Sequence, residues 1–278
     1  MRGSESDTHE RNRFQSLPRT RARHWVLLLA TLLAVVALDL SLGSVLIPLK
    51  SVIGSLLGDE RVPPGWREIV LLFRLPRTVT AMLGGAALGI AGLKMQTLFR
   101  NPLVSILLQF SQEYQMQSYL AWTFGSFGGV TWKQMPLFAA TLLAGLALAW
   151  MLAKPLNGFL LGEGYARSMG VNVRRTRYWI ILGASLLAGC VTAYCGPIGF
   201  LGIAVPHLGR LLFKTSDHHV LVPAVILVGA ILALTADLLS QVPGTRIALP
   251  LNAVTSLIGA PVVVGVILRR QRIMEAGA

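Results

Sequence analysis

The residues that could do chemistry are a few acids and histidines set in apolar sequence. Asp39 and Asp237 lie inside long apolar runs, where an ionisable side chain serves a transport pathway or is held by a local hydrogen bond. His207 and the adjacent His218 and His219 could offer imidazole nitrogens to a metal. A lone histidine in an apolar helix is more often a hydrogen-bonded structural residue, and an exposed pair is usually inert. We therefore predict no metal site.

Motifs of energy conversion and hydrolysis are absent from the sequence. It contains no G-x-x-x-x-G-K-[ST] loop to cradle a phosphate, and neither H-E-x-x-H nor G-x-S-x-G. Cys190 and Cys195 lie five residues apart in an apolar helix, on different faces, so they cannot easily form a disulfide or share a metal. The sequence predicts no catalytic residues and no cofactor. Any energy for function must come from another chain.

The composition is that of a protein that crosses a membrane several times. Of the 278 residues, 54% are apolar and only 13% are charged, whereas soluble domains carry about 25% charged residues. The net charge is +13, but the basic residues form short blocks at the ends of apolar runs. This pattern indicates membrane topology and attraction to lipid rather than nucleic-acid binding.

Apolar runs divide the chain into a tail, a membrane domain and a second tail. Residues 1–23 are basic and predicted to be a disordered cytoplasmic tail. Residues 24–272 form the transmembrane domain, and residues 273–278 form the C-terminal tail. Spans are predicted at 25–49, 136–153, 178–195, 220–239 and 251–268, and a further short span is predicted to end near residue 213.

The stretch from residue 71 to 103 combines an entry signal, a packing surface and a cation. Pro76 predicts a helix entry at the membrane interface. The small residues between Gly84 and Gly92 predict a surface that another helix can approach closely. Lys94 is expected to extend to the same cytoplasmic interface as Arg100.

The longest polar interruption in the second half of the chain is residues 161–177, LGEGYARSMGVNVRRTR. Gly162, Gly164 and Gly170 are expected to provide tight turns between short helical pieces. Four arginines place this hairpin in the cytoplasm by the positive-inside rule. It is either a docking surface for a soluble motor or a solvated basic loop.

Residues 104–135 create a conflict in topology. Their apolar run is too short to cross a membrane alone, because a span needs about 20 residues. If they do not cross, the arginines of residues 161–177 fall on the outer side. Either this segment crosses with its polar residues lining a cavity, or the chain lacks a helix.

Six stretches in a fixed order carry a resemblance to a known family. They are RLPRT (74–78), GAALGIAGLKMQTLFRNPL (85–103), WTFGSFGGVTW (122–132), LGEGYARSMGVNVRR (161–175), GPIGFLGIAVPHLGRLL (196–212) and LIGAPVVVGVILRR (257–270). The chain resembles the FecCD family, the permease subunits of ABC importers for ferric siderophores, haem and cobalamin. The resemblance covers nearly everything from about residue 40 onward.

This resemblance implies an all-α membrane helix bundle of the type II ABC importer permease type. It also implies a homodimer or a pair with a paralogous permease, a separate ABC ATPase and a periplasmic substrate-binding protein. The chain would lie in the bacterial inner membrane with both termini in the cytoplasm. The cargo would be a siderophore, haem or cobalamin.

The resemblance also assigns contact residues on both sides of the membrane. Those matching the ATPase-coupling segment are Leu161, Gly162, Glu163, Ala166, Arg167, Gly170 and Val171. Arg74 and Arg77 match outer-face arginines that meet carboxylates of the binding protein. Relatives often carry a third such arginine where this chain has Gln241, and Arg246 is expected to substitute.

The chain departs from the family after Leu103. Relatives continue with a Pro-Gly turn and further spans before the block that contains WTFGSF, whereas here Leu103 runs almost directly into it. We expect an internal deletion that leaves about seven or eight spans of the family's ten. The alternatives are a non-functional deletion product and an ion-coupled secondary transporter, which would need Asp39 or Asp237 for coupling.

Overall fold

The computed structural model describes residues 17–98, 122–241, 249–261 and 265. These residues form helices and connecting loops without a β-strand. The helices, in chain order, are α2 (Leu17–Ser41), α3 (Leu49–Leu57), α4 (Pro64–Glu68), the π-helix η1 (Ile69–Arg74), α5 (Leu75–Leu98), the 3₁₀ turn η2 (Phe127–Gly129), α7 (Met135–Met151), α8 (Ala153–Leu160), α9 (Glu163–Ser168), α10 (Val173–Cys195), α11 (Leu201–Phe213) and α12 (His218–Ser240). Residues 251–261 are also helical.

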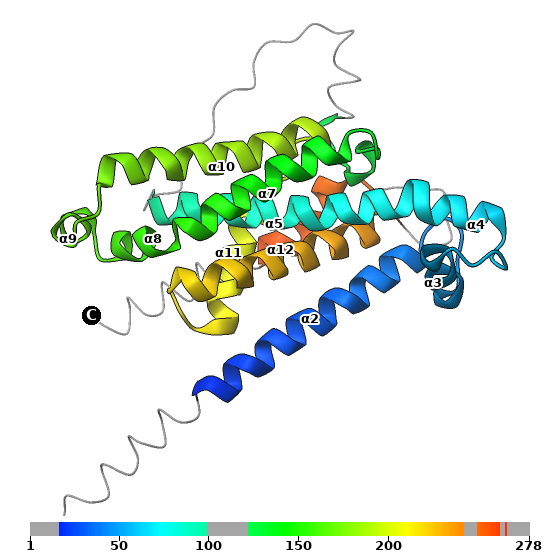
Figure 1. Cartoon of the computed structure of the whole chain (residues 1–278), viewed down its shortest axis with the longest axis horizontal. Helices are drawn as coiled ribbons and strands as arrows, with labels where there is room; N and C mark the ends of the chain where they lie inside the picture. Colours follow the sequence, from blue (N-terminus) through cyan, green and yellow to red (C-terminus); the bar gives the residue numbers. More distant parts are fainter. Residues whose placement is uncertain (1–16, 99–121, 242–248, 262–264, 266–278) are drawn as a thin grey trace, which may run out of the picture.

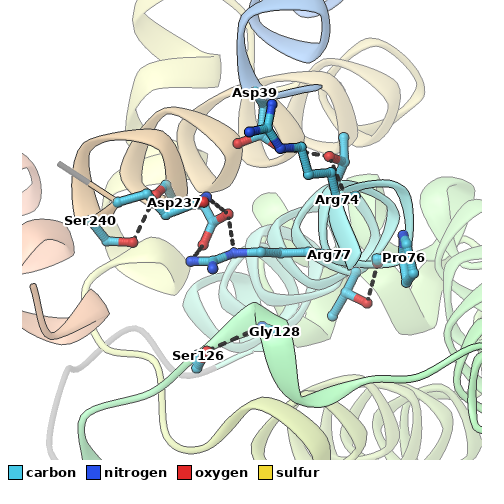
Figure 2. A network of polar contacts seen from close by, with 11 residues as sticks. Asp39, Arg74, Pro76, Arg77, Ser126, Gly128, Asp237 and Ser240 are labelled. Carbon is cyan, nitrogen blue, oxygen red and sulfur yellow. Dashed lines mark hydrogen bonds and ion pairs between the residues drawn. The ribbon is translucent and has the colours of Figure 1, made fainter. Parts of the chain in front are cut away.

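The long helices lie roughly along one axis, with α5 in the middle (Figure 1). Helix α5 packs against α12, α10, α11 and α7, and α2 packs against α12. We call the end of the bundle that carries α8 and α9 the hairpin end. The opposite end, where α3 and α4 lie, is the arginine end, because Arg74 and Arg77 are there (Figures 1 and 2).

Close approach of α5 to its neighbours depends on glycine. A Cβ atom on Gly85 would lie 2.2 Å from the carbonyl oxygen of Gly229 in α12, and one on Gly92 would lie 1.7 Å from that of Gly202 in α11. Only a residue without a side chain fits at such contacts. The predicted small-residue surface is therefore confirmed.

Three local expectations were wrong. Pro76 is not a helix entry, because α4, η1 and α5 run continuously from Pro64. The π-turn precedes the proline, which has no N–H to donate to the preceding turn. The first span ends at Ser41 rather than continuing to Leu49. Lys94 does not extend to the interface, since its side chain is only 1% exposed.

Four described helices are long and apolar enough to cross a membrane. A fifth is reached if α7 and α8, which meet at a 52° bend, form one span. Helix α11 is apolar but has only 13 residues. The all-helical fold is as predicted, but the expected seven or eight spans are not confirmed by the described residues.

The directions of the helices bear on the topology conflict. Trp132, just before α7, donates a hydrogen bond from Nε1 to the Leu71 carbonyl oxygen in η1, at the arginine end. Leu148, near the other end of α7, lies with Lys94 of α5 against Gly183. Helices α5 and α7 therefore run in the same direction, and the chain that joins them begins at the hairpin end and finishes at the arginine end. The expected deletion point after Leu103, and the crossing of residues 104–121, lie outside the described residues.

Candidate functional site

The hairpin at 161–177 is a folded element. Helix α9 stands between two glycines with positive φ, Gly162 at 107° and Gly170 at 80°, a conformation that glycine adopts without a steric penalty. Both turn predictions are confirmed at these positions. Gly164 differs, because it lies within α9.

A small core of its own supports the hairpin. Ala166 of α9 is fully buried and packs with Phe159 of α8 and Val173 of α10. The Val171 N–H donates to the Ala166 carbonyl at 3.0 Å, and the Asn172 side chain accepts from the Arg175 N–H at the start of α10. Arg177 forms an ion pair with Glu163 across the hairpin. These contacts give the hairpin a defined shape.

The exposed surface of the hairpin presents large apolar side chains among basic ones. Leu161 is 66% exposed, Tyr165 51% and Met169 61%. Arg167 and Arg174 are exposed beside them. Exposed apolar groups with a basic border are typical of a surface that another protein covers.

The seven predicted coupling residues occupy different positions on the hairpin. Leu161, Glu163, Arg167 and Gly170 are exposed, Gly162 and Val171 are half-buried, and Ala166 is buried. Ala166 supports the hairpin from inside and is not placed for surface contact. Tyr165 and Met169 were missed by the sequence comparison, although their spacing of four residues would have put them on one helix face.

Helix α8 is tied to the start of α12 by a polar joint. The Asn157 side-chain amide donates to Asp217 at 2.7 Å, and the His218 backbone N–H donates to Asn157 Oδ1 at 2.8 Å. Asp217 also accepts from the His219 N–H and so caps α12. The bond from Asn157, followed by that from His219, lowers the pKa of the Asp217 carboxyl below its ordinary value. His218, one of the histidines considered as a metal ligand, thus belongs to the joint between α8 and α12.

An ion pair joins α5 to α12 at the arginine end (Figure 2). Arg77 Nε lies 2.7 Å from Asp237 Oδ2, and Arg77 Nη2 lies 2.8 Å from Oδ1. The Asp237 side chain is 1% exposed and that of Arg77 is 26% exposed. Gln241 also donates to Asp237, at 3.0 Å.

Arg74 has a different environment from Arg77. It is 8% exposed, donates to the Leu40 carbonyl oxygen at 2.7 Å, and also donates to that of Val45. The nearby Asp39 accepts from the Thr78 hydroxyl at 2.6 Å. Arg74 therefore secures the turn after α2. The docking role expected for both arginines stays a prediction, for which the exposed edge of Arg77 is better placed, and Arg246 lies outside the described residues.

A pocket of about 320 Å³ opens beside Arg77. Its walls come from four parts of the chain: the start of α5, the end of α12, the 124–126 loop and residues 249–251, where the last described helix begins. Arg77, Asp237, Ser126 and Ser240 are its polar residues. The described residues contain no group of three or more His, Cys, Asp or Glu side chains that could hold a metal ion.

Comparison with known proteins identifies the architecture. The profile of the FecCD transport family matches residues 30–106 and residues 103–270. The chain belongs to the FecCD transport family. The two matches meet at residues 103–106, which is where the sequence predicts that a segment is missing.

Curated relatives are vitamin B12 import permeases. The chain is 29% identical to permease protein BtuC of Klebsiella pneumoniae over 333 aligned positions, which cover 91% of this chain and 96% of the relative. That alignment is longer than the 278-residue chain, so the relative has internal residues that this chain lacks. The chain is also 34% identical to BtuC of Vibrio cholerae over 205 positions, covering 72% of this chain and 58% of the relative.

A solved structure supports the same fold. A chain from a structure described as an inward-facing conformation of a metal-chelate type ABC transporter superposes with a TM-score of 0.72 at 22% identity. The superposition covers 90% of this chain and 99% of that one. Together with the family match and the permease relatives, this fold shows that the chain is a membrane permease subunit of an ABC importer and not an enzyme. Its family works with a separate ATPase and a binding protein.

Proposed function

We propose that this chain is the permease subunit of an ABC importer that carries a metal chelate across a bacterial inner membrane. Cobalamin is the first cargo to test, because the two curated relatives compared above are vitamin B12 permeases. A ferric siderophore or haem is the next, since the family also serves those cargoes. The observation that carries the proposal is the folded hairpin of a FecCD protein, with its exposed apolar and basic face.

In this proposal the hairpin end faces the cytoplasm and receives the ATPase. The basic residues of 161–177 favour that side, and the start of α2 lies at the same end, where Trp25 contacts Phe213 of α11. The exposed Leu161, Tyr165 and Met169 supply the apolar contact and the arginines its basic border. Closure of the ATPase subunits would move the hairpin and switch access to the transport path.

The arginine end then faces the periplasm and receives the binding protein. Arg77 is the docking residue that the contacts favour. A second copy of the chain, or a paralogous permease, completes the transport path. Both termini would lie in the cytoplasm, and for the N-terminus the direction of α2 favours this side.

Reconstitution tests this function directly. The chain is assembled in proteoliposomes with its ATPase and binding protein, and ATP-driven uptake of radiolabelled cyanocobalamin and of a ferric siderophore is measured. Uptake of one cargo is expected. Assembly of all subunits with no uptake of either cargo or of haem would refute import and leave a deletion product.

Variants of the hairpin test the docking surface. Changing both Leu161 and Met169 to Ala should weaken ATPase binding about tenfold, because two exposed apolar contacts are lost. Leu57→Ala is the matched control, since Leu57 is 81% exposed at the arginine end. Equal ATPase binding by the double variant and the control would contradict the assignment. Labelling of Arg174→Cys from the outer face would contradict the orientation.

A further inference from the structure

The pocket beside Arg77 is too small for the proposed cargo. Its volume of about 320 Å³ is near the lower limit for sites that hold a drug-sized ligand, and a metal macrocycle is larger than such ligands. Its walls combine the apolar side chains of Phe124, Leu249 and Leu251 with the four polar residues named above. Such a pocket suits the end of a single side chain from a partner protein.

The guanidinium of Arg77 has one used edge and one open edge. Nε and Nη2 both donate to Asp237, which occupies the side of the fork toward α12. Nη1 lies toward Gly128, and an added Cβ there would be 3.8 Å from it. Figure 2 shows Arg77 between Asp237 and the Ser126–Gly128 segment. Arginine carries five N–H donors in a fixed plane, so the end formed by Nη1 and Nη2 can still receive a second carboxylate.

The pocket contains one further group that fits an incoming oxygen atom. The Ser126 hydroxyl accepts from the Gly128 N–H at 3.1 Å, and no described residue accepts from it in return. Asp237 is fixed by Gln241 and by its burial. Asp237 therefore cannot follow Arg77 outward, and it sets the plane of the guanidinium.

We propose that Asp237 is the positioning residue that turns the open edge of Arg77 toward the binding-protein carboxylate with which Arg77 is expected to pair. This inference rests on the proposed function. Asp237 holds the fork by its Nε edge, as a second-layer acid fixes an arginine for bidentate binding. The rival interpretation is that Asp237 competes with the partner for Arg77. The two interpretations predict opposite effects of removing its charge.

The experiment measures the affinity of the purified, fluorescently labelled binding protein for the permease assembled with its ATPase. Arg77→Gln should weaken binding roughly tenfold, the effect of about one charge-assisted hydrogen bond. Asp237→Asn should weaken it roughly three- to tenfold, because the guanidinium loses its fixed orientation. In the Arg77→Gln background, Asp237→Asn should have almost no further effect, since it acts through Arg77.

Asp39→Asn is the matched control. Asp39 is another buried acid at the same end, but its bond is to Thr78 and not to Arg77. It should leave the affinity unchanged, and purification of each variant with bound ATPase shows that it is folded. Tighter binding by Asp237→Asn would overturn the positioning role in favour of competition, and unchanged binding by both Arg77→Gln and Asp237→Asn would overturn the site. If the unaltered chain binds neither ATPase nor binding protein, the proposed function itself fails.

Discussion

Replacement of Gly92 by alanine should separate α5 from α11. The added Cβ would lie 1.7 Å from the Gly202 carbonyl oxygen, 2.5 Å from its carbon and 2.7 Å from its Cα. All three atoms belong to the backbone, so no side chain can rotate away. Ordinary contact with a Cβ begins at 3.4 Å, so the helices must move apart by more than an ångström.

The expected cost is at the upper end of that for overpacked cores, about 3 kcal/mol. For a chain of this size, such a loss lowers Tm by roughly 6–12 °C. Cys195 is buried, so a thiol-reactive dye can follow thermal unfolding of the detergent-solubilised protein through the exposure of its sulfur.

Two further glycine variants make the test specific. A Cβ on Gly202 would lie 3.4 Å from the Leu88 oxygen and 3.7 Å from the Gly92 Cα, so Gly202→Ala should change Tm by only a few degrees. Gly189 in α10 has open space at its Cβ position, and Gly189→Ala should be neutral or slightly stabilising. The close-contact reasoning is refuted if Gly92→Ala and Gly189→Ala have the same Tm.

Three other predictions concern polar groups. Lys94→Met should stabilise the protein by about 1–3 kcal/mol, because the Lys94 ammonium is buried and has no hydrogen-bond partner among the described residues; a lower Tm would show that the charge is needed. Asn252→Ala should cost about 2–4 kcal/mol and speed hydrogen exchange at residues 122–125 and 196–199, because Asn252 donates to Thr123 and Pro197 at 2.6 Å and accepts from Gly199 at 3.0 Å. Asn252→Asp keeps only the acceptor, so its exchange rates should fall between those of the unaltered protein and those of Asn252→Ala. Slower exchange than in the unaltered protein, in either variant, would contradict this. The lowered pKa of Asp217 means that its stabilisation is present above its ordinary value of 3.8 and is lost as pH falls through the folded value; the small Tm deficit of Asp217→Asn should therefore disappear in acid, and a deficit that persists there would rule out the titration.

Local patterns predicted the parts of the structure that depend on local chemistry. Small residues repeated along α5 predicted close helix contacts, and Gly85 and Gly92 make them. Glycines bordering a polar stretch predicted the turns of the hairpin, and Gly162 and Gly170 have the required φ. In each case the residue type has few other uses at that spacing.

Contacts between distant residues could not be predicted in this way. Arg77 and Asp237 are separated by 160 positions, and the sequence contains no signal that pairs them. Lys94 was expected to reach water because lysine usually does, but its position on α5 faces α10, where it lies close to Gly183. For Arg77, the sequence did not reveal which residue is its partner. For Lys94, it did not reveal which face of α5 the residue occupies.

The distribution of contacts also indicates where the molecule can move. Helices α5 and α12 are joined by the glycine contact of Gly85 with Gly229 and by the bidentate pair of Arg77 with Asp237. Sliding one helix along the other would break both contacts, and it would leave the buried Asp237 carboxylate without its partner. We therefore expect α5 and α12 to move as one body. Helix α8 is joined to this body through Asn157, so a push on the hairpin should reach α12 through α8. The 52° bend between α7 and α8 is then the place where we expect α7 to change its angle to that body.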